Sequence, residues 1–208
     1  MFTVGQIGEN CFLFRKDGSD RALIVDPGDE AERILAAADA LGVTIEGILV
    51  THTHFDHIGA VAPIAKATGA PVWCPEIETP VLADINSFVP WPGFGPFESY
   101  EADHIVSGGE KLELAGMEID VIFTPGHSPG HVTYSVRDEA TIFSGDVLFQ
   151  GSVGRTDLPG GDWATLLESI RKLVESHPPE TIVYPGHMGI TTLGAERATN
   201  PFLAELAR

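Results

Sequence analysis

The chain has 208 residues, of which 43% are hydrophobic, and its 12 basic and 30 acidic side chains give a formal net charge of −18. This length can bury one full core, so we expect a single domain over residues 1–208. The acidic balance disfavours a nucleic-acid partner, and no apolar run approaches the roughly 18 residues of a membrane span. The N-terminus lacks the pattern of a secretory signal, so we expect a cytoplasmic protein with reduced, buried thiols at Cys11 and Cys74.

Apolar runs with β character recur along the chain and predict strands. They lie at 2–7, 11–16, 21–25, 45–50, 71–74, 117–123, 132–136, 140–144 and 181–184. Amphipathic stretches with acidic starts or glycine and proline stops predict helices. These lie at 29–42, 57–69, 161–179 and 194–207, and Asp162 is the N-cap candidate of the third. Three strands precede any helix and later strands mix with helices, which favours sheets covered by helices over a doubly wound sheet.

The segment "DINSFVPWPGFGPFESYEAD" (84–103) interrupts this pattern. It combines prolines and glycines with the aromatic residues Phe88, Trp91, Phe94, Phe97 and Tyr100. A long irregular stretch inside a compact domain is usually functional or mobile. Two interpretations stay open at this point: an aromatic lid over a pocket, or a loop held on the body by its own aromatic side chains.

Side chains that bind metals follow four of the predicted strands almost at once. They come from "THTHFDH" after "IEGILV", "TPGHSPGH" after "EIDVIF", "GDVLF" after "ATIFS" and "PGHMG" after "ETIVY". The candidates are His52, His54, Asp56, His57, His127, Asp146 and His187. If these strands run the same way, all seven side chains gather along one edge of the fold, where strand ends fix the geometry of loops.

Seven donors are too many for one structural zinc, which takes four ligands and leaves no opening. Five imidazoles and two carboxylates suit two cations, with coordination positions left for water. His52 and His54 point the same way in an extended segment, because the side-chain period is two. Asp56 and His57 then fall where the chain turns into a helix, within reach of a second metal. We expect His131 to support a ligand or pack in a strand.

These residues resemble the metallo-β-lactamase superfamily, and within it the glyoxalase II-like (hydroxyacylglutathione hydrolase-like) hydrolases. The resemblance covers nearly the whole chain and includes "GENCFLF", "IVDPGD", "GSVGRTDLPGGD" and "PGHMGITTLGAERATNPFL", the last similar to short, one-domain members. It implies an α+β fold, a four-layer αββα sandwich in which two mixed β-sheets are flanked by helices.

The resemblance also implies a ligand set. One metal would be held by His52, His54 and His127, and the other by Asp56, His57 and His187, with Asp146 bridging both. The expected cofactors are two divalent ions, zinc first, with iron or manganese as alternatives. Asp146 argues against the β-lactamases themselves, whose common forms use a cysteine in that region.

The implied activity is cleavage of a small-molecule thioester such as S-lactoylglutathione. A metal-bridging hydroxide would attack the carbonyl, with Asp56 as the catalytic residue that orients it, and a thiolate leaves without a strong acid. Only 21 residues (188–208) follow His187, too few for the helical domain with which two-domain glyoxalase II enzymes bind glutathione. Arg155 either binds a substrate carboxylate or forms a surface ion pair with Asp157.

Other activities on the same scaffold stay open. A persulfide dioxygenase would use one ferrous iron held by two histidines and a carboxylate. The sequence "GRTD" occurs in that group too, whereas His131 and "PGHMGITTLG" resemble the hydrolases. A lactonase would act on a similar carbonyl. Nuclease activity is disfavoured by the charge of −18, and a noncatalytic metal-binding module would leave open coordination positions without a use.

Overall fold

The computed structural model describes residues 1–89 and 91–204 and divides into two compact units. Unit 1 comprises Met1–Val106 and Glu113–Met117, and unit 2 comprises Ser107–Leu112 and Glu118–Arg208. Within the described ranges, no helix is long and apolar enough to cross a membrane. The single domain over residues 1–208 and the cytoplasmic location stay predictions.

Unit 1 contains a six-stranded mixed sheet in the order β1-β2-β3-β4-β5-β6. The strands are β1 (Phe2–Val4), β2 (Glu9–Phe14), β3 (Arg21–Val25), β4 (Thr44–Leu49), β5 (Val72–Pro75) and β6 (His104–Val106). Strands β1 to β3 are antiparallel, whereas β3 to β6 are parallel. The loops after β3, β4 and β5 therefore leave the sheet at the same edge.

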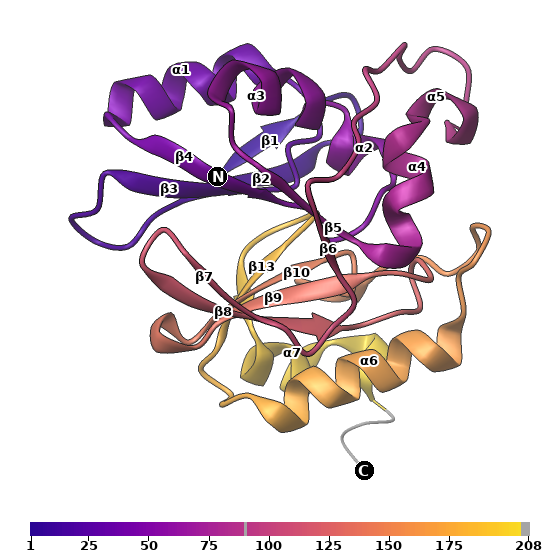
Figure 1. Cartoon of the computed structure of the whole chain (residues 1–208). Helices are drawn as coiled ribbons and strands as arrows, with labels where there is room; N and C mark the ends of the chain where they lie inside the picture. The colour runs from indigo at the N-terminus through magenta and orange to yellow at the C-terminus, as the bar shows by residue number, and fades with distance from the viewer. Residues whose placement is uncertain (90, 205–208) are drawn as a thin grey trace. The chain divides into compact units, whose positions relative to one another are not determined.

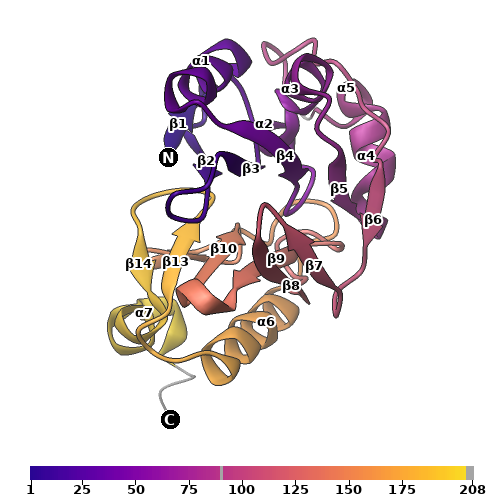
Figure 2. The same ribbon diagram turned by 60° about the vertical axis from the view of Figure 1, so that its left-hand side comes forward.

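Helices of unit 1 follow these parallel strands. They are α1 (Ala31–Leu41), α2 (Phe55–Ile58), α3 (Val61–Thr68), the 3-10 turn η1 (Glu76–Glu78), α4 (Thr79–Ala83) and α5 (Ile85–Phe88). Helices α1 and α3 lie together on one face of the sheet (Figures 1 and 2). Ile34 and Ile64 of these helices join Ile24 and Ile48 of the strands in one buried core.

Unit 2 contains most of the second mixed sheet, in the order β14-β13-β10-β9-β8-β7, while Glu113, Leu114 and Met117 of this sheet are assigned to unit 1. The strands are β7 (Lys111–Leu114), β8 (Met117–Phe123), β9 (Val132–Val136), β10 (Thr141–Gly145), β13 (Ile182–Pro185) and β14 (Thr191–Thr192), with a separate hairpin β11 (Leu148–Phe149) and β12 (Ser152–Val153). Strand β9 is antiparallel to β8 and to β10, and β10 is parallel to β13. Strands β8, β10 and β13 therefore run the same way.

Two helices of unit 2, α6 (Trp163–Ser176) and α7 (Leu193–Thr199), lie on one face of its sheet (Figures 1 and 2). Leu166, Ile170 and Leu173 of α6 pack with Ile142 and Val183 in the core of this unit. The remaining turns are the 3-10 turns η2 (Arg137–Glu139) and η3 (Pro201–Leu203). Each unit is thus a mixed sheet with helices packed on it.

The predicted strands at 21–25, 117–123 and 132–136 are confirmed at both ends. The strand predicted at 2–7 was too long, because β1 stops at Val4. The chain then turns at Gly5 and Gly8, whose φ angles are 65° and 76°. Strands β6 and β7 were not predicted. They are short and largely solvent-exposed, so they lack the apolar runs by which strands are recognised.

The predicted helix 161–179 is confirmed as α6, and the Asp162 carboxylate accepts a hydrogen bond from Thr165 N at 2.8 Å. The predicted helix 57–69 is instead two helices, α2 and α3, because Ala60 N donates to Pro27 O rather than to a helical carbonyl. The helix expected at 194–207 ends at Thr199, before Pro201. Its residues 205–207 lie outside the described residues.

The 84–103 segment is held on unit 1 by its own side chains. The Asn86 amide donates to Phe97 O and accepts from Phe97 N, both at 2.8 Å. The Phe94 and Phe97 rings lie 4.9 and 5.8 Å from the Phe55 ring. The interpretation as a loop held by its aromatics is confirmed for Phe94, Phe97 and Tyr100, which pack against the core of unit 1, whereas Phe88 and Trp91 are exposed and α5 occupies the start of the segment. The lid stays a prediction.

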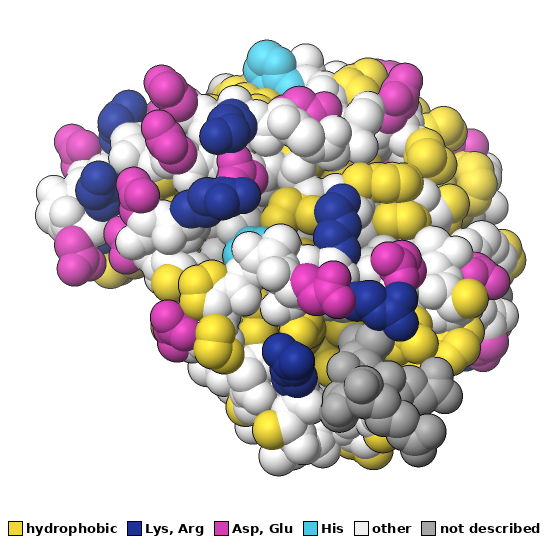
Figure 3. All heavy atoms as spheres, turned by 90° about the horizontal axis from the view of Figure 1, so that it is seen from below, with side chains coloured by type: hydrophobic (Ala, Val, Ile, Leu, Met, Phe, Trp, Pro, Cys, Tyr) yellow, Lys and Arg dark blue, Asp and Glu magenta, His cyan; other side chains and the backbone are white. Residues whose placement is uncertain are grey.

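The face drawn in Figure 3 carries basic side chains among acidic and hydrophobic ones. Within unit 2, Arg137 pairs with Asp120 and Arg171 pairs with Glu168. Such exposed pairs contribute little to stability, because water screens both charges. Each pair instead neutralises the positive charge of its arginine, on a chain whose formal net charge is −18.

Candidate metal centre

In unit 1, the "THTH" stretch after β4 is fixed by two carboxylates through its threonines. Thr51 donates its N–H to Asp26 Oδ1 at 2.7 Å and its hydroxyl to Asp26 Oδ2 at 2.6 Å. Thr53 donates its N–H and hydroxyl to Glu78 Oε2 at 3.2 and 2.5 Å. Asp26 follows β3 and Glu78 lies in η1 after β5, and both are buried. The alternation of side chains then presents the histidines together.

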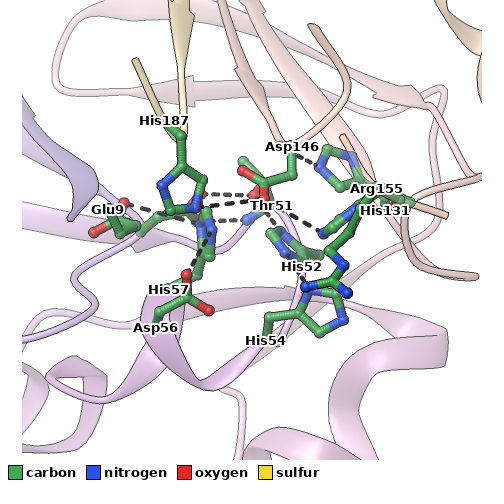
Figure 4. A network of polar contacts seen from close by, with 12 residues as sticks. Glu9, Thr51, His52, His54, Asp56, His57, His131, Asp146, Arg155 and His187 are labelled. Atoms are coloured by element: carbon green, nitrogen blue, oxygen red, sulfur yellow. Dashed lines mark hydrogen bonds and ion pairs between the residues drawn. The ribbon is translucent and has the colours of Figure 1, made fainter. Parts of the chain in front are cut away.

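The hydrogen bonds of Thr51 determine which nitrogen of His52 carries the proton. The single hydroxyl proton of Thr51 goes to Asp26, so its oxygen accepts from His52 Nδ1 at 3.1 Å. His52 Nε2 therefore keeps a lone pair, and it lies 3.1 Å from His54 Nδ1. Two imidazole nitrogens on one tetrahedral zinc are about 3.3 Å apart, given metal–nitrogen distances of about 2.0–2.1 Å. The pair fits a shared cation (Figure 4).

His57 and Asp56 come from the first turn of α2, as Figure 4 shows. His57 is fully buried and donates from Nδ1 to Asp26 Oδ2 at 3.0 Å, with Glu9 Oε1 at 3.9 Å. Its Nε2 is 3.8 Å from Asp56 Oδ2. A carboxylate that takes the Nδ1 proton fixes the ring and leaves Nε2 for a cation. We call His52, His54, Asp56 and His57 the unit 1 cluster.

In unit 2, three donors follow strands that run the same way. His127 follows β8, Asp146 follows β10 and His187 follows β13. Gly145 and Pro185 are paired at the ends of the parallel strands, which brings the next residues together. Asp146 Oδ2 lies 3.4 Å from His127 Nε2 and 3.6 Å from His187 Nε2. We call His127, Asp146 and His187 the unit 2 cluster.

The backbone holds the unit 2 cluster in place. His127 donates from Nδ1 to Arg155 O at 2.7 Å, which leaves its Nε2 lone pair facing Asp146. Asp146 N donates to His131 Nε2 at 3.1 Å, so His131 supports the loop that carries Asp146 (Figure 4). A Cβ at Gly154 would lie 1.8 Å from Asp146 O and 3.1 Å from His127 Nδ1, so only glycine fits there.

Comparison with known proteins identifies the family of this chain. The sequence profile of the Metallo-beta-lactamase superfamily matches residues 4–187. The chain belongs to this superfamily. It is 40% identical over 205 residues to the probable metallo-hydrolase YqgX of Bacillus subtilis (strain 168), covering 96% of this chain and 94% of that one. It is 35% identical over 208 residues to the hydroxyacylglutathione hydrolase GloC of Haemophilus influenzae, with coverages of 94% and 92%.

Solved structures agree with the superfamily assignment. The crystal structure of the BLEG-1 B3 metallo-beta-lactamase superposes with a TM-score of 0.91 at 40% identity, covering 97% of both chains. The crystal structure of TTHA1623 in a di-iron-bound form gives 0.85 at 42% identity, covering 97% of this chain and 98% of that one. The predicted α+β fold of the metallo-β-lactamase superfamily is confirmed, and the chain is a metal-dependent hydrolase of that superfamily.

The Arg155 side chain forms an ion pair with Asp157 in unit 2. Its Nε and Nη2 donate to the two Asp157 oxygens at 2.7 Å each, and both side chains are largely exposed. The hydrogen bond from Arg155 lowers the pKa of Asp157 to about 2. The predicted surface ion pair is confirmed. Substrate binding by Arg155 stays a prediction.

Sequence reasoning did not assign the residues that orient the histidines. Asp26 had a usable signal, because it follows an apolar run directly, as the ligand candidates do. No sequence signal pointed to Glu78, because its partner Thr53 lies 25 positions away. His177 caps the C-terminal end of α6 and donates from Nδ1 to Leu173 O at 3.1 Å.

Proposed function

We propose that this chain is a dinuclear metal-dependent hydrolase that cleaves thioesters such as S-lactoylglutathione. One cation would be held by His52, His54 and His127, and the other by Asp56, His57 and His187, with Asp146 shared by both. One observation carries the proposal. His52, His57 and His127 each give the Nδ1 proton to a protein acceptor, so each keeps an Nε2 lone pair for a cation.

The donor chemistry supports two divalent ions. Imidazole suits zinc, iron and related cations. Two carboxylates carry less negative charge than two divalent ions carry positive charge, so the site would stay net positive, and seven donors leave coordination positions for water. Zinc is the expected ion, with iron or manganese as alternatives, and TTHA1623 is named in a di-iron-bound form. When bound, such a pair supplies a water whose pKa is near 7 and polarises a carbonyl oxygen.

The protein side chains would then orient the reactants. Asp56 keeps part of its carboxylate exposed, with 15% of the side chain accessible, so it can orient the attacking water and accept its proton. Buried Asp26 and the Arg155 carbonyl keep the imidazoles in one tautomer throughout. A thiolate, with an ordinary pKa near 8.5, leaves without a strong general acid. The name of the relative GloC points to the same bond class.

The test is one preparation, purified without added metal, that is used for metal analysis and for a substrate panel. The panel contains S-lactoylglutathione, an acyl-homoserine lactone, a β-lactam and glutathione persulfide. We expect about two ions per chain and the highest kcat/KM for the thioester. One iron per chain with oxygen consumption on the persulfide would overturn the proposal. Faster cleavage of the lactone or of the β-lactam would show that thioesters are the wrong substrate class, while the assignment as a hydrolase would stand.

A further inference from the structure

Unit 1 has a pocket of about 430 Å³ beside Asp56. Its walls are the β1–β2 turn with Ile7, the loop after β3 with Asp29, the start of α2 with Phe55, and the stretch 93–98. This volume is within the range of about 300–1,000 Å³ typical of small-molecule sites. Because Asp56 belongs to the unit 1 cluster, a group in this pocket lies beside one of the proposed metal ligands.

One wall of the pocket is aromatic and held in place. The Phe55 ring is buried and lies 4.9 Å from Phe94 and 5.8 Å from Phe97. Trp91 lies outside the lining and supports this wall from behind, with its ring 6.0 Å from Phe55 and 6.3 Å from Phe94. The paired hydrogen bonds between Asn86 and Phe97 fix this stretch. Rings at 4.5–7 Å spacing favour a further ring or a branched apolar group as their neighbour.

The charged side chains of the pocket are acidic. Asp29, Asp56 and Glu98 line it, and the described lining residues include no lysine, arginine or histidine. Lys66 offsets the charge of Glu98 from outside the lining, and a cation held by Asp56 would offset that carboxylate, so the negative charge facing a ligand is mainly that of Asp29. The thiol ends of common biological thioesters carry carboxylates or phosphates, which the Asp29 carboxylate disfavours. An uncharged apolar acyl end meets no such penalty.

We infer that this pocket binds the acyl group of the substrate and that it prefers an uncharged aromatic acyl group, such as phenylacetyl, over lactoyl. This inference rests on the proposed thioester hydrolysis. The aromatic wall supplies the contact, the Asp29 carboxylate disfavours an anionic thiol end, and the acyl carbonyl would lie beside Asp56 of the unit 1 cluster. Phe94 is the residue that most directly sets the preference, because it lines the pocket and contacts both Phe55 and Trp91.

A binding experiment tests the pocket without catalysis. The ¹⁵N-labelled chain of 208 residues is titrated with S-(2-phenylethyl)-N-acetylcysteamine, a thioether that cannot be hydrolysed, and amide shifts are followed by NMR. We expect saturable shifts at Gly5, Gly28, Gly59 and Gly93, which line the pocket. Phe94→Ala should weaken binding about 3- to 10-fold, and Phe94→Leu should do so less. No saturable shift at these glycines would overturn the inference.

Phe88→Ala is the matched control, because Phe88 belongs to the same segment but is 54% exposed and lies outside the pocket lining. We expect its affinity for the thioether to stay within about twofold of wild type. Equal loss of affinity in the Phe88 and Phe94 variants would overturn the inference.

A kinetic experiment then compares phenylacetyl and lactoyl thioesters of the same uncharged thiol, N-acetylcysteamine, on the holoenzyme. We expect a higher kcat/KM for phenylacetyl, and Phe94→Ala should reduce this ratio about 3- to 10-fold while Phe88→Ala does not. Equal kcat/KM for both acyl groups overturns the inference and leaves thioester hydrolysis intact. Saturable NMR shifts at the lining glycines without cleavage of any thioester would overturn the proposed function. The binding of an aromatic group in the pocket would then be supported by the titration alone.

Discussion

The two clusters orient their histidines by different means. In unit 1 the ligand candidates lie within six positions of sequence, and Asp26 and Glu78 hold them through side-chain hydrogen bonds. In unit 2 the candidates come from three strands, and the acceptor of His127 is the backbone carbonyl of Arg155. A side-chain acceptor is lost by one substitution, whereas a backbone acceptor is not. The two units should therefore tolerate mutation at different places.

The largest expected effect is that of Asp146→Ala. Asp146 lies between His127 and His187 and is the proposed shared ligand, so its loss should remove at least one ion and lower kcat/KM by about 1,000-fold. Metal analysis and steady-state kinetics on one preparation measure both. Asp157→Ala is the control, because Asp157 is an exposed carboxylate of the same unit. An unchanged rate in Asp146→Ala would remove the dinuclear mechanism.

The next effect concerns the backbone of unit 2. Gly154→Ala places a Cβ 1.8 Å from Asp146 O. This clash can be relieved only by moving the backbone at position 154 or the loop that carries Asp146. We expect a loss of about 3 kcal/mol in the free energy of unfolding, measured by urea denaturation. Gly151→Ala is the control: it has a positive φ of 69° but open space around its Cβ, so it costs only about 1 kcal/mol. Equal losses would show that the close approach is unimportant.

The contrast between the clusters is tested by the pair Asp26→Asn and Arg155→Ala. Asp26 accepts from His57, and its positive φ of 48° suits asparagine, so the substitution removes charge with little strain. We expect metal affinity to fall about 10- to 100-fold. Arg155→Ala leaves the carbonyl that holds His127, so its affinity should change less than about threefold. Titration with a competing chelator measures both, and a larger loss in Arg155→Ala would reverse the comparison.

The ligand candidates of each cluster could be predicted from sequence because local rules bring them together. Strand ends place His127, Asp146 and His187 at one edge, and the period of two aligns His52 with His54. Their hydrogen-bond partners depend on contacts between distant segments. No local pattern shows that Thr53 meets Glu78, or that Ala60 N leaves its helix for Pro27 O and splits the predicted helix 57–69.

The smallest expected effect is a pH dependence of stability that arises in unit 2, away from its cluster. Burial lowers the pKa of His177, which lies between Ser135 and Leu173 O, below its ordinary value near 6.5. The unfolded chain therefore binds this proton at a higher pH than the folded chain does. The contribution is fully present above about pH 6.5 and is lost as the pH falls through the folded pKa.

Urea denaturation of wild type and His177→Gln at pH 8 and pH 5 measures this contribution. Glutamine stays uncharged, and its side-chain oxygen can still accept from the Ser135 hydroxyl as His177 Nε2 does, so the stability difference between the two pH values should be smaller in the variant. Arg137 and Asp120 act on His177 in opposite directions, so burial decides the sign. An equal pH dependence in both proteins would place the acid sensitivity elsewhere. A larger one in the variant would mean that the folded state binds the His177 proton more tightly than the unfolded state.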